Sequence, residues 1–394
     1  MSHSASPALP AISPAATAIS QIDTPAALIE LPRMLHNIAR MQERMNALGV
    51  RFRPHAKTAK SPDVNRAQAA AGAQGITVST LKEAENFFAG GVTDILYAVG
   101  MVPHKLPQAL ALLRQGCALQ LITDNVAAAT AIADFGRAHH VVLDVLIEID
   151  TDGHRSGIKP DDDTLIAVGR ALHEGGMRLA GVLTHAGASY DLNTPEALTA
   201  MAEQERARCV RAAERLRAAG LPCPIVSVGS TPTALSAQSL AGVTEVRAGV
   251  YVFFDLVMHN VGVCRTNEIA LSVLTTVIGH QLDKGWAIVD AGWMAMSRDR
   301  GTQKQAHDYG YGQVCDVHGQ VLDGYLLTGA NQEHGILSLA SGAAADTGIA
   351  TRFPVGTQLR ILPNHACATG AQFGEYVVVQ GDAVKEVWGR FGGW

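Results

Sequence analysis

A lysine follows a short alternating run near the start of the chain. The segment RPHAKTAKS at 53–61 contains His55, Lys57 and Lys60, and alternation along an extended strand places His55 and Lys57 on one face. A lysine at such a position is costly to bury unless it is neutralised, hydrogen-bonded or covalently used. Lys57 is therefore a candidate nucleophile with His55 beside it. Lys60 falls beyond the strand, and we expect it to be solvated or to lie on the side of a phosphate.

Two glycine-containing turns later in the chain have the composition of an anion site. SVGSTPT at 227–233 offers backbone N–H groups and two hydroxyls, and RAGVY at 247–251 lets the backbone approach the same anion. The residues concerned are Gly229, Ser230, Thr231, Gly249 and Val250. Each turn alone is equally an ordinary glycine turn, but together they favour a phosphate site. A phosphate site and an unexplained lysine suggest pyridoxal 5'-phosphate, which needs an anchored phosphate and an amine for a Schiff base.

A histidine and a cysteine lie two positions apart near the C-terminus. In NHAC at 364–367, His365 and Cys367 would point the same way on a strand, and imidazole with thiolate suits Zn²⁺ or a similar borderline metal. Two protein ligands leave coordination positions open for water or a substrate oxygen. The same spacing also fits a core histidine next to a small apolar cysteine. From the spacing alone the pair is a weak metal candidate.

These groups need a scaffold that brings their segments together. Eight short β-branched runs alternate with helical patterns, which predicts a (β/α)₈ barrel. The predicted strands are 50–57, 75–79, 94–99, 118–123, 141–149, 178–184, 224–229 and 244–250. Chemistry in such a barrel lies at the carboxyl ends of the strands, where Lys57, both glycine turns and His185 fall. A doubly wound open sheet is the alternative architecture.

The pattern changes after about residue 266, where strand-like runs are separated by Gly-rich turns. We therefore predict a barrel at 32–265 and a mostly β domain at 266–394. The extended piece at 21–31 is expected to join the β domain. Residues 1–20, rich in Ser, Ala and Pro, are expected to form a disordered leader.

The composition narrows the class of partner. With 31 basic and 36 acidic residues the net charge is −5, and no basic cluster indicates nucleic acid or an anionic membrane. The sequence lacks a long apolar span and a secretory signal, and its 6 cysteines include no CxxC pair. We expect a cytoplasmic protein with a small-molecule ligand. His334 is either a group behind the site or a turn residue.

Together these segments resemble the D-threonine aldolase and D-serine dehydratase family, whose fold is the alanine-racemase-like barrel followed by a β domain. The likeness runs from DTPAALIEL to the C-terminus. It implies that Lys57 in RPHAKT is the Schiff-base lysine, that Arg155 in GHRSG and Tyr190 in HAGASY lie by the cofactor ring, and that PNHAC holds the metal. It also adds Tyr251, in AGVY, to the phosphate cradle. A homodimer is implied as well.

One departure from the aldolases indicates which reaction to expect. The aldolases tend to carry His-x-Asp where this chain has His-x-Cys, the form found in D-serine dehydratases. Longer stretches such as TDGHRSG and VDAGWMAMSRDRGT resemble the bacterial D-threo-3-hydroxyaspartate dehydratases. The resemblance thus implies a lyase that eliminates water from a D-3-hydroxy amino acid, using pyridoxal 5'-phosphate and Zn, Mn, Co or Ni. A retro-aldol enzyme and a non-catalytic cofactor-binding protein are the alternatives.

Overall fold

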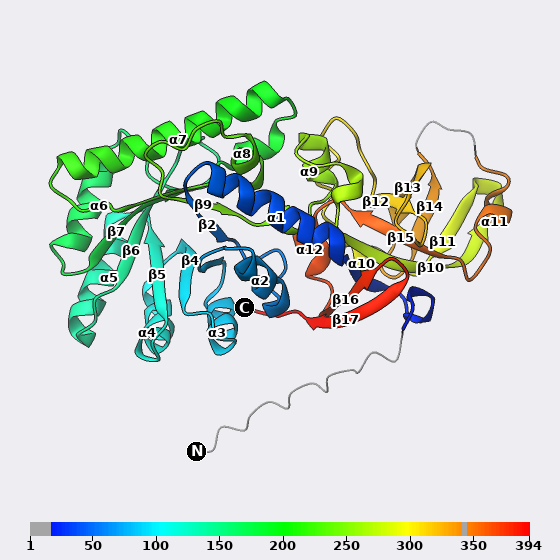
Figure 1. The fold of residues 1–394 in the computed structure, drawn as a ribbon, viewed down its shortest axis with the longest axis horizontal. Coiled ribbons are helices and arrows are strands. Elements are labelled where there is room, and N and C mark those ends of the chain that lie inside the picture. Colours follow the sequence, from blue (N-terminus) through cyan, green and yellow to red (C-terminus); the bar gives the residue numbers. More distant parts are fainter. Residues whose placement is uncertain (1–16, 341–344) are drawn as a thin grey trace, which may run out of the picture.

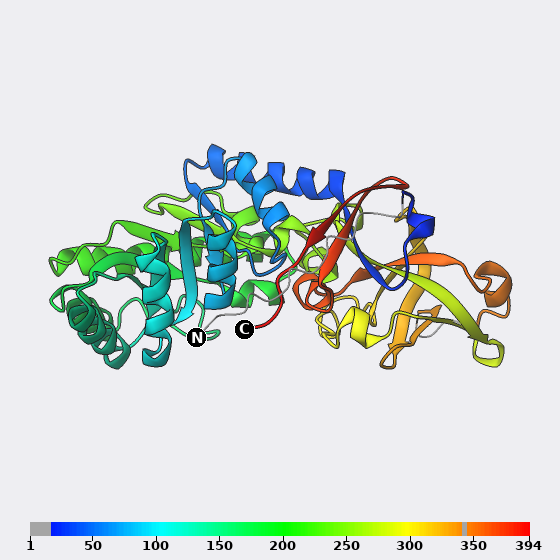
Figure 2. The same cartoon turned by 90° about the horizontal axis from the view of Figure 1, so that it is seen from below.

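The computed structural model describes residues 17–340 and 345–394. Two halves lie side by side along the long axis, a barrel that includes most of the helices and a β domain built from the later strands (Figure 1). Helix α1 (Leu31–Ala47) connects the N-terminal strand of the β domain to the first barrel strand. Seen from below, that N-terminal strand runs beside the last strands of the chain (Figure 2).

Eight parallel strands form the barrel in the order β2-β9-β8-β7-β6-β5-β4-β3. Their residues are mostly buried, as expected for parallel strands that are covered by helices. The strands are β2 (Arg51–Pro54), β3 (Ile76–Val78), β4 (Asp94–Gly100), β5 (Ala118–Thr123), β6 (Asp144–Ile149), β7 (Arg178–Thr184), β8 (Ile225–Val228) and β9 (Glu245–Ala248). Each overlaps a predicted strand, so the predicted (β/α)₈ barrel is confirmed.

Helices alternate with the barrel strands, and several begin at a side-chain cap. Thr80, Asn125, Thr194 and Ser230 each accept a hydrogen bond from the backbone N–H three residues on. The helices are α2 (Pro62–Ala70), α3 (Leu81–Ala89), α4 (Leu106–Arg114), α5 (Val126–His139), α6 (Thr164–His173), α7 (Pro195–Ala218), α8 (Thr231–Ser236) and α9 (Leu256–Val261). No helix in the described residues is long and apolar enough to cross a membrane.

A buried arginine helps to close the barrel where β2 meets β3. These strands stand at opposite ends of the sheet order and are paired by an isolated bridge between His55 and Thr77. Arg53, fully buried, donates to Glu245 Oε2 at 2.8 Å, to Asp94 Oδ1 at 2.9 Å and to the Ile76 carbonyl at 3.3 Å. Its guanidinium thus links both neighbouring strands and neutralises the buried carboxylate of Glu245.

The β domain is a nine-stranded sheet with its own apolar core. Strand β10 pairs with both β11 and β15, so six antiparallel strands close on themselves as a second, smaller barrel. Eight of the nine strands follow the barrel in the chain: β10 (Leu271–Gln281), β11 (Trp286–Val289), β12 (Gly312–Cys315), β13 (Val321–Ala330), β14 (Gly335–Leu339), β15 (Gln358–Pro363), β16 (Glu375–Gln380) and β17 (Ala383–Gly389). Short helices α10 (Trp293–Met296), α11 (Ile349–Arg352) and α12 (Ala366–Gly370) connect some of them.

The N-terminal segment belongs to the β domain. Strand β1 (Ala26–Glu30) pairs antiparallel with β10 and parallel with β16. Residues 1–16 of the predicted leader lie outside the described residues. Residues 17–20 do not fit a disordered leader, because Ala18 bridges to Ala383 and the Ile19 side chain is buried among apolar neighbours.

Candidate active site

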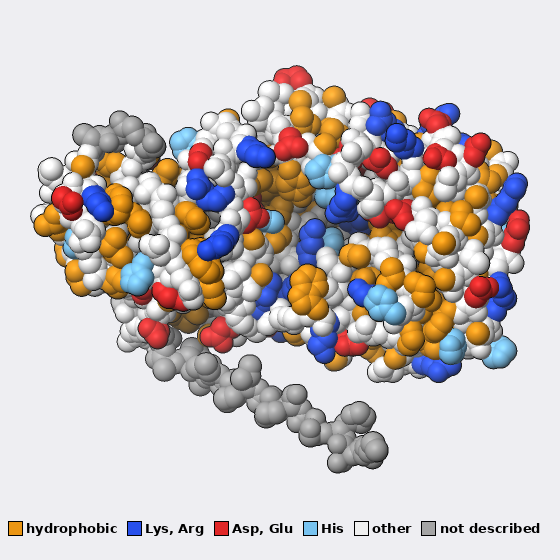
Figure 3. Space-filling model, turned by 180° about the vertical axis from the view of Figure 1, so that it is seen from behind, with side chains coloured by type: hydrophobic (Ala, Val, Ile, Leu, Met, Phe, Trp, Pro, Cys, Tyr) orange, Lys and Arg blue, Asp and Glu red, His pale blue; other side chains and the backbone are white. Residues whose placement is uncertain are grey.

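A cavity of about 900 Å³ lies where the carboxyl ends of the barrel strands face the β domain. From behind, the space-filling view shows a hollow between the two halves, with Lys, Arg and His side chains around it (Figure 3). The barrel supplies its lining mainly from the segments at the ends of β2, β4, β6, β7, β8 and β9. The β domain supplies residues 298–301 and 303–306, with His365 and Cys367. Both halves of the molecule are therefore needed to form this site.

Lys57 lies in a turn just after the first barrel strand and lines the cavity. Strand β2 ends at Pro54, so the prediction that the strand reaches Lys57 is wrong; His55 makes an isolated bridge and a turn follows it. The His55 Nδ1 accepts the Lys57 backbone N–H at 3.4 Å. Burial, with the positive charges of Lys57 and Arg247, holds the pKa of His55 well below its ordinary value, so this imidazole is neutral.

Lys60 faces away from the cavity. Its Nζ lies 3.0 Å from Oε1 of Glu83, a buried carboxylate on α3. The expectation that Lys60 is solvated or near a phosphate is therefore wrong: a turn with a positive φ of 46° at Lys60 directs it towards α3. Of the two lysines, only Lys57 lines the cavity.

The two glycine turns after β8 and β9 meet as predicted, but not all of the expected residues can donate to an anion. The N–H groups of Gly229 and Ser230 are used within the protein, by Glu205 Oε1 at 2.9 Å and by Thr233 Oγ1 at 3.0 Å. Thr231 and Val250 instead begin short helices, where the first N–H has no intrahelical partner, and both line the cavity. These two N–H groups are the donors that fit an anion.

The tyrosine of the second turn binds elsewhere. Its backbone N–H donates to Thr231 Oγ1 at 3.2 Å and joins the two turns, whereas the Tyr251 hydroxyl accepts from Gln68 Nε2 at 2.8 Å. The Tyr251 side chain is outside the cavity lining. A Cβ at Gly249 would lie 3.1 Å from the His55 carbonyl oxygen, which is a tight contact. A larger residue here would therefore require the segment after β2 to shift slightly.

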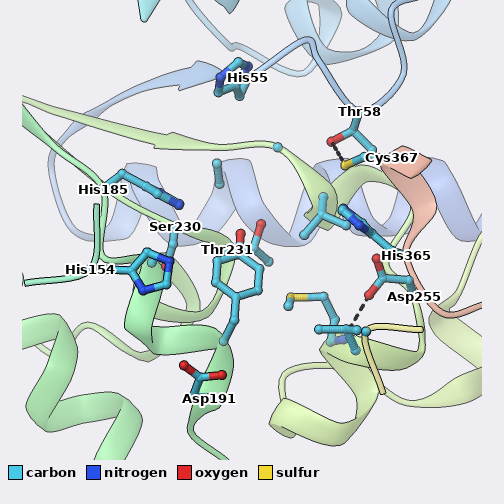
Figure 4. Close-up of a pocket in the computed structure, with 18 of the residues that line it drawn as sticks. His55, Thr58, His154, His185, Asp191, Ser230, Thr231, Asp255, His365 and Cys367 are labelled. Carbon is cyan, nitrogen blue, oxygen red and sulfur yellow. Dashed lines mark hydrogen bonds between the residues drawn. The ribbon is translucent and has the colours of Figure 1, made fainter. Parts of the chain in front are cut away.

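Arg155, His185 and Tyr190 line one side of the cavity. His185 Nδ1 donates to the Gly229 carbonyl at 3.0 Å, and burial together with Lys57 lowers the pKa of His185 to about 3. Burial raises the pKa of the Tyr190 phenol, which therefore stays protonated. Arg155 is half exposed and lies 3.4 Å from Glu148. Figure 4 shows His185, with His154 below it, on the side of the cavity opposite His365.

His365 and Cys367 lie together at the other side of the cavity (Figure 4). They are not on a strand, as the sequence predicted: β15 ends at Pro363, His365 precedes helix α12 and Cys367 is in its first turn. The helix turn still brings them together. Burial alone would raise the pKa of Cys367, but the charge and hydrogen bond of His365, with Lys57 and Thr58, lower it, which favours the thiolate.

Two carboxylates that the sequence analysis did not select hold this pair in place. Asp299 Oδ2 accepts from His365 Nδ1 at 2.6 Å, which fixes the orientation of the imidazole beside Cys367. Asp255 Oδ2 accepts the Ala366 N–H at 2.9 Å and thereby fixes the start of α12. No group of three or more His, Cys, Asp or Glu side chains with metal-binding geometry is found in the described residues. The protein thus offers two metal ligands and two carboxylates that position them.

Arg247 is a further cavity residue that sequence reasoning missed. It is buried, and its Nε donates to Ser227 Oγ at 2.9 Å while Nη2 donates to the Thr184 carbonyl. A signal was present, because Glu245 and Arg247 alternate within a predicted barrel strand, where charged side chains are costly to bury. His334, in contrast, is an exposed turn residue outside the cavity, and its carbonyl accepts the Asn331 N–H at 2.8 Å.

Glu205 is the second missed residue, and it supports the cavity from behind. It is buried on α7, and its Oε1 accepts the N–H groups of Ala186 at 3.0 Å and Gly229 at 2.9 Å. The carboxylate therefore ties the segment after β7 to the turn after β8. Its position in the sequence gave the signal: Glu205 lies between Ala202 and Cys209, at helical spacing on the apolar face.

The site has room and donors for the groups that the resemblance implies. A cavity of about 900 Å³ is within the usual range for a cofactor together with a small substrate. The Thr231 and Val250 N–H groups fit a phosphate, and Lys57 is an accessible amine in the same cavity. Imidazole next to a thiol that favours ionisation is a donor set for a borderline metal.

Comparison with known proteins points to the same family as the motifs of the sequence. Residues 29–257 match the alanine racemase N-terminal domain family, and residues 270–379 match the putative serine dehydratase domain family. The chain is 70% identical to D-threo-3-hydroxyaspartate dehydratase of Delftia sp. (strain HT23), over 90% of this chain and 93% of the relative. It is 28% identical to D-serine dehydratase of Dictyostelium discoideum, over 87% of this chain and 89% of the relative.

The solved structure of the Delftia dehydratase superposes with a TM-score of 0.94, at 68% identity, over 96% of this chain and 100% of that one. Two variant structures of a D-threo-3-hydroxyaspartate dehydratase replace a histidine and a cysteine two positions apart by alanine, and the cysteine variant is described as metal-free. The family match covers more than half of the chain, and the overall identity to a curated relative is high. The chain therefore belongs to the D-threonine aldolase and D-serine dehydratase family, whose barrel is of the alanine-racemase type.

Proposed function

We propose that this enzyme removes water from D-threo-3-hydroxyaspartate and releases oxaloacetate and ammonia. The observation that carries the proposal is the meeting of Lys57, the anion-binding turns and the His365–Cys367 pair around one cavity. The high identity to the Delftia dehydratase supports the choice of substrate. D-serine, which has the same groups except the second carboxylate, would give pyruvate by the same route.

The proposed reaction needs a cofactor, pyridoxal 5'-phosphate, and a divalent metal ion. Lys57 would hold pyridoxal 5'-phosphate covalently, the Thr231 and Val250 N–H groups would bind its phosphate, and His365 with Cys367 would hold a divalent metal. When bound, the cofactor supplies an electron sink for the bond broken at the α-carbon, and the metal supplies a Lewis acid for the leaving hydroxyl. The spacing of the histidine and cysteine in the two variant structures supports the metal pair.

The residues of the chain divide the remaining work. Lys57 Nζ takes the α-proton, because it is a flexible, exposed amine at the carboxyl end of the barrel. His55 and His185 stay neutral and hold the surrounding backbone, His55 through the Lys57 N–H and His185 through the Gly229 carbonyl. Tyr190, with its pKa raised by burial, remains a hydrogen-bond donor. Arg155 and Arg247 supply positive charge in the same cavity.

The products of the purified holoenzyme test the proposal. Incubated with D-threo-3-hydroxyaspartate, it should release oxaloacetate and ammonia, and removal of the metal by a chelator should lower the rate at least about 100-fold, since a Lewis acid contributes several kcal/mol. Glycine and glyoxylate would instead identify a retro-aldol enzyme. Cofactor binding without turnover of any D-3-hydroxy amino acid would leave a non-catalytic binding protein.

The proposal extends to the domain limits, the cellular compartment and the number of subunits. We propose a barrel at 32–265, a β domain at 266–394 joined by the strand at 21–31, and a homodimer, as the family resemblance implies. Six free cysteines, five of them buried, support a reducing cytoplasm. Val99 lines the cavity while 43% exposed, which supports a second copy that covers this edge. Sedimentation of the purified holoenzyme would measure the subunit number.

A further inference from the structure

The cavity contains more cationic side chains than the proposed cofactor chemistry uses. Its cationic lining residues are Lys57, Arg155, Arg247, Arg298, Arg300 and Lys304. Arg155 is paired with Glu148 at 3.4 Å, Arg300 with Asp308 at 2.8 Å, and Arg247 is buried on Ser227 and Thr184. Across residues 17–340 and 345–394, no carboxylate lies within 4.0 Å of the charged nitrogens of Arg298 or Lys304. These two are the cations left for an anionic part of the substrate.

The chemistry of the proposed substrate indicates where such a cation must lie. In 3-hydroxyaspartate the second carboxylate and the hydroxyl are on the same carbon atom, so a group that binds the carboxylate must be next to the group that receives the hydroxyl. That second group is the His365–Cys367 pair. Arg298 precedes Asp299, whose Oδ2 accepts from His365 Nδ1 at 2.6 Å. Of the two free cations, Arg298 is therefore the one next in sequence to the carboxylate that holds His365.

The exposed Arg298 side chain has an aromatic neighbour. Its Cζ lies 4.1 Å from the centre of the Trp293 ring, which restricts the side chain by stacking. The chain enters the segment through Ser297, a buried residue with a positive φ of 69°, and Ser297 Oγ accepts the Asp299 N–H at 3.1 Å. A serine rarely adopts this conformation, and such backbone strain is concentrated at functional sites.

We propose that Arg298 binds the second carboxylate of the substrate and so determines specificity for dicarboxylic D-3-hydroxy amino acids. The inference rests on the proposed function, because it assigns a part of the same substrate. A planar guanidinium can form two parallel hydrogen bonds to a carboxylate, which the ammonium of Lys304 cannot. Arg298 acts only on substrates with the second carboxylate, and D-serine lacks it.

The test compares two substrates in one variant. For Arg298→Met, kcat/KM on D-threo-3-hydroxyaspartate should fall at least about 100-fold, the value of a lost pair of charge-assisted hydrogen bonds, while kcat/KM on D-serine stays within about threefold. Arg298→Lys should lie between, since it keeps the charge but loses the second bond. The matched control is Arg352→Met: Arg352 also lies over an aromatic ring, Tyr325, but outside the cavity, and its substrate ratio should equal that of the wild type.

A binding measurement separates this inference from the proposed function. Dissociation constants of D-aspartate and D-alanine are measured by calorimetry on the holoenzymes. The wild type should bind D-aspartate, which has the second carboxylate, more tightly than D-alanine, and the two constants should converge in Arg298→Met. If the wild type releases no oxaloacetate, the proposed function fails, and the binding constants still decide the role of Arg298. Equal losses on both substrates, unchanged D-aspartate binding, or a selective loss confined to Lys304→Met would each overturn the assignment.

Discussion

At the scale of single residues, the two lysines of RPHAKTAKS have separate tasks. Lys57 faces the cavity, whereas Lys60 neutralises the buried Glu83. We expect Lys57→Ala to abolish the visible absorbance of the lysine-bound cofactor and to leave stability nearly unchanged. Lys60→Ala should keep the absorbance but lower the free energy of unfolding by on the order of 2 kcal/mol, because Glu83 loses its partner. Absorbance spectra and denaturant unfolding of both variants check this, and the reverse pattern would refute the assignment.

At the scale of elements, α7 positions the cofactor turns through one carboxylate. Glu205→Ala leaves the Ala186 and Gly229 N–H groups buried without a partner, so we expect a loss of about 3 kcal/mol in unfolding free energy and at least about tenfold weaker cofactor binding. Glu205→Gln keeps a carbonyl oxygen for both donors and should lose less than half as much. Denaturant unfolding and cofactor titration measure the two effects. Equal losses in the two variants would show that the charge, not the hydrogen bonds, matters.

The elements also show what the sequence could predict. The positions of the β-branched runs predicted all eight barrel strands. A strand that is buried on both faces has a nearly continuous apolar sequence, which is easy to recognise. The pattern does not specify the residue at which a strand ends. Lys57 and the His365–Cys367 pair were therefore assigned to strands but lie in a turn and at a helix start. Arg247 and Glu205 were missed because their role is to satisfy buried partners from distant segments.

At the scale of the whole molecule, the two halves meet around the site rather than beside it. Thr58 of the barrel lies 3.2 Å from Cys367 of the β domain, and the Tyr376 hydroxyl donates to the Ala59 carbonyl at 3.0 Å. Asp255, after the last barrel strand, fixes the helix that carries the metal pair. Because Thr58 and Ala59 belong to the turn that contains Lys57, the docking of the halves and the geometry of the site are one structural feature.

This buried site also makes the stability of the whole molecule depend on pH. The folded-state pKa of His185 is lowered to about 3 from an unfolded value of 6.5, and that of His55 is also well below 6.5, so between these values the unfolded chain binds protons that the folded protein does not. Stability is therefore lost as the pH falls below 6.5, at up to about 1.4 kcal/mol per pH unit for each histidine. In cofactor-free His185→Gln, we expect the loss of unfolding free energy between pH 7 and pH 5 to be about 2 kcal/mol smaller than in the wild type. The control is His173→Gln, because His173 is exposed, and its loss of unfolding free energy over this pH range should equal that of the wild type. If His185→Gln lost as much stability as the wild type over this range, His185 would not be neutral in the folded protein.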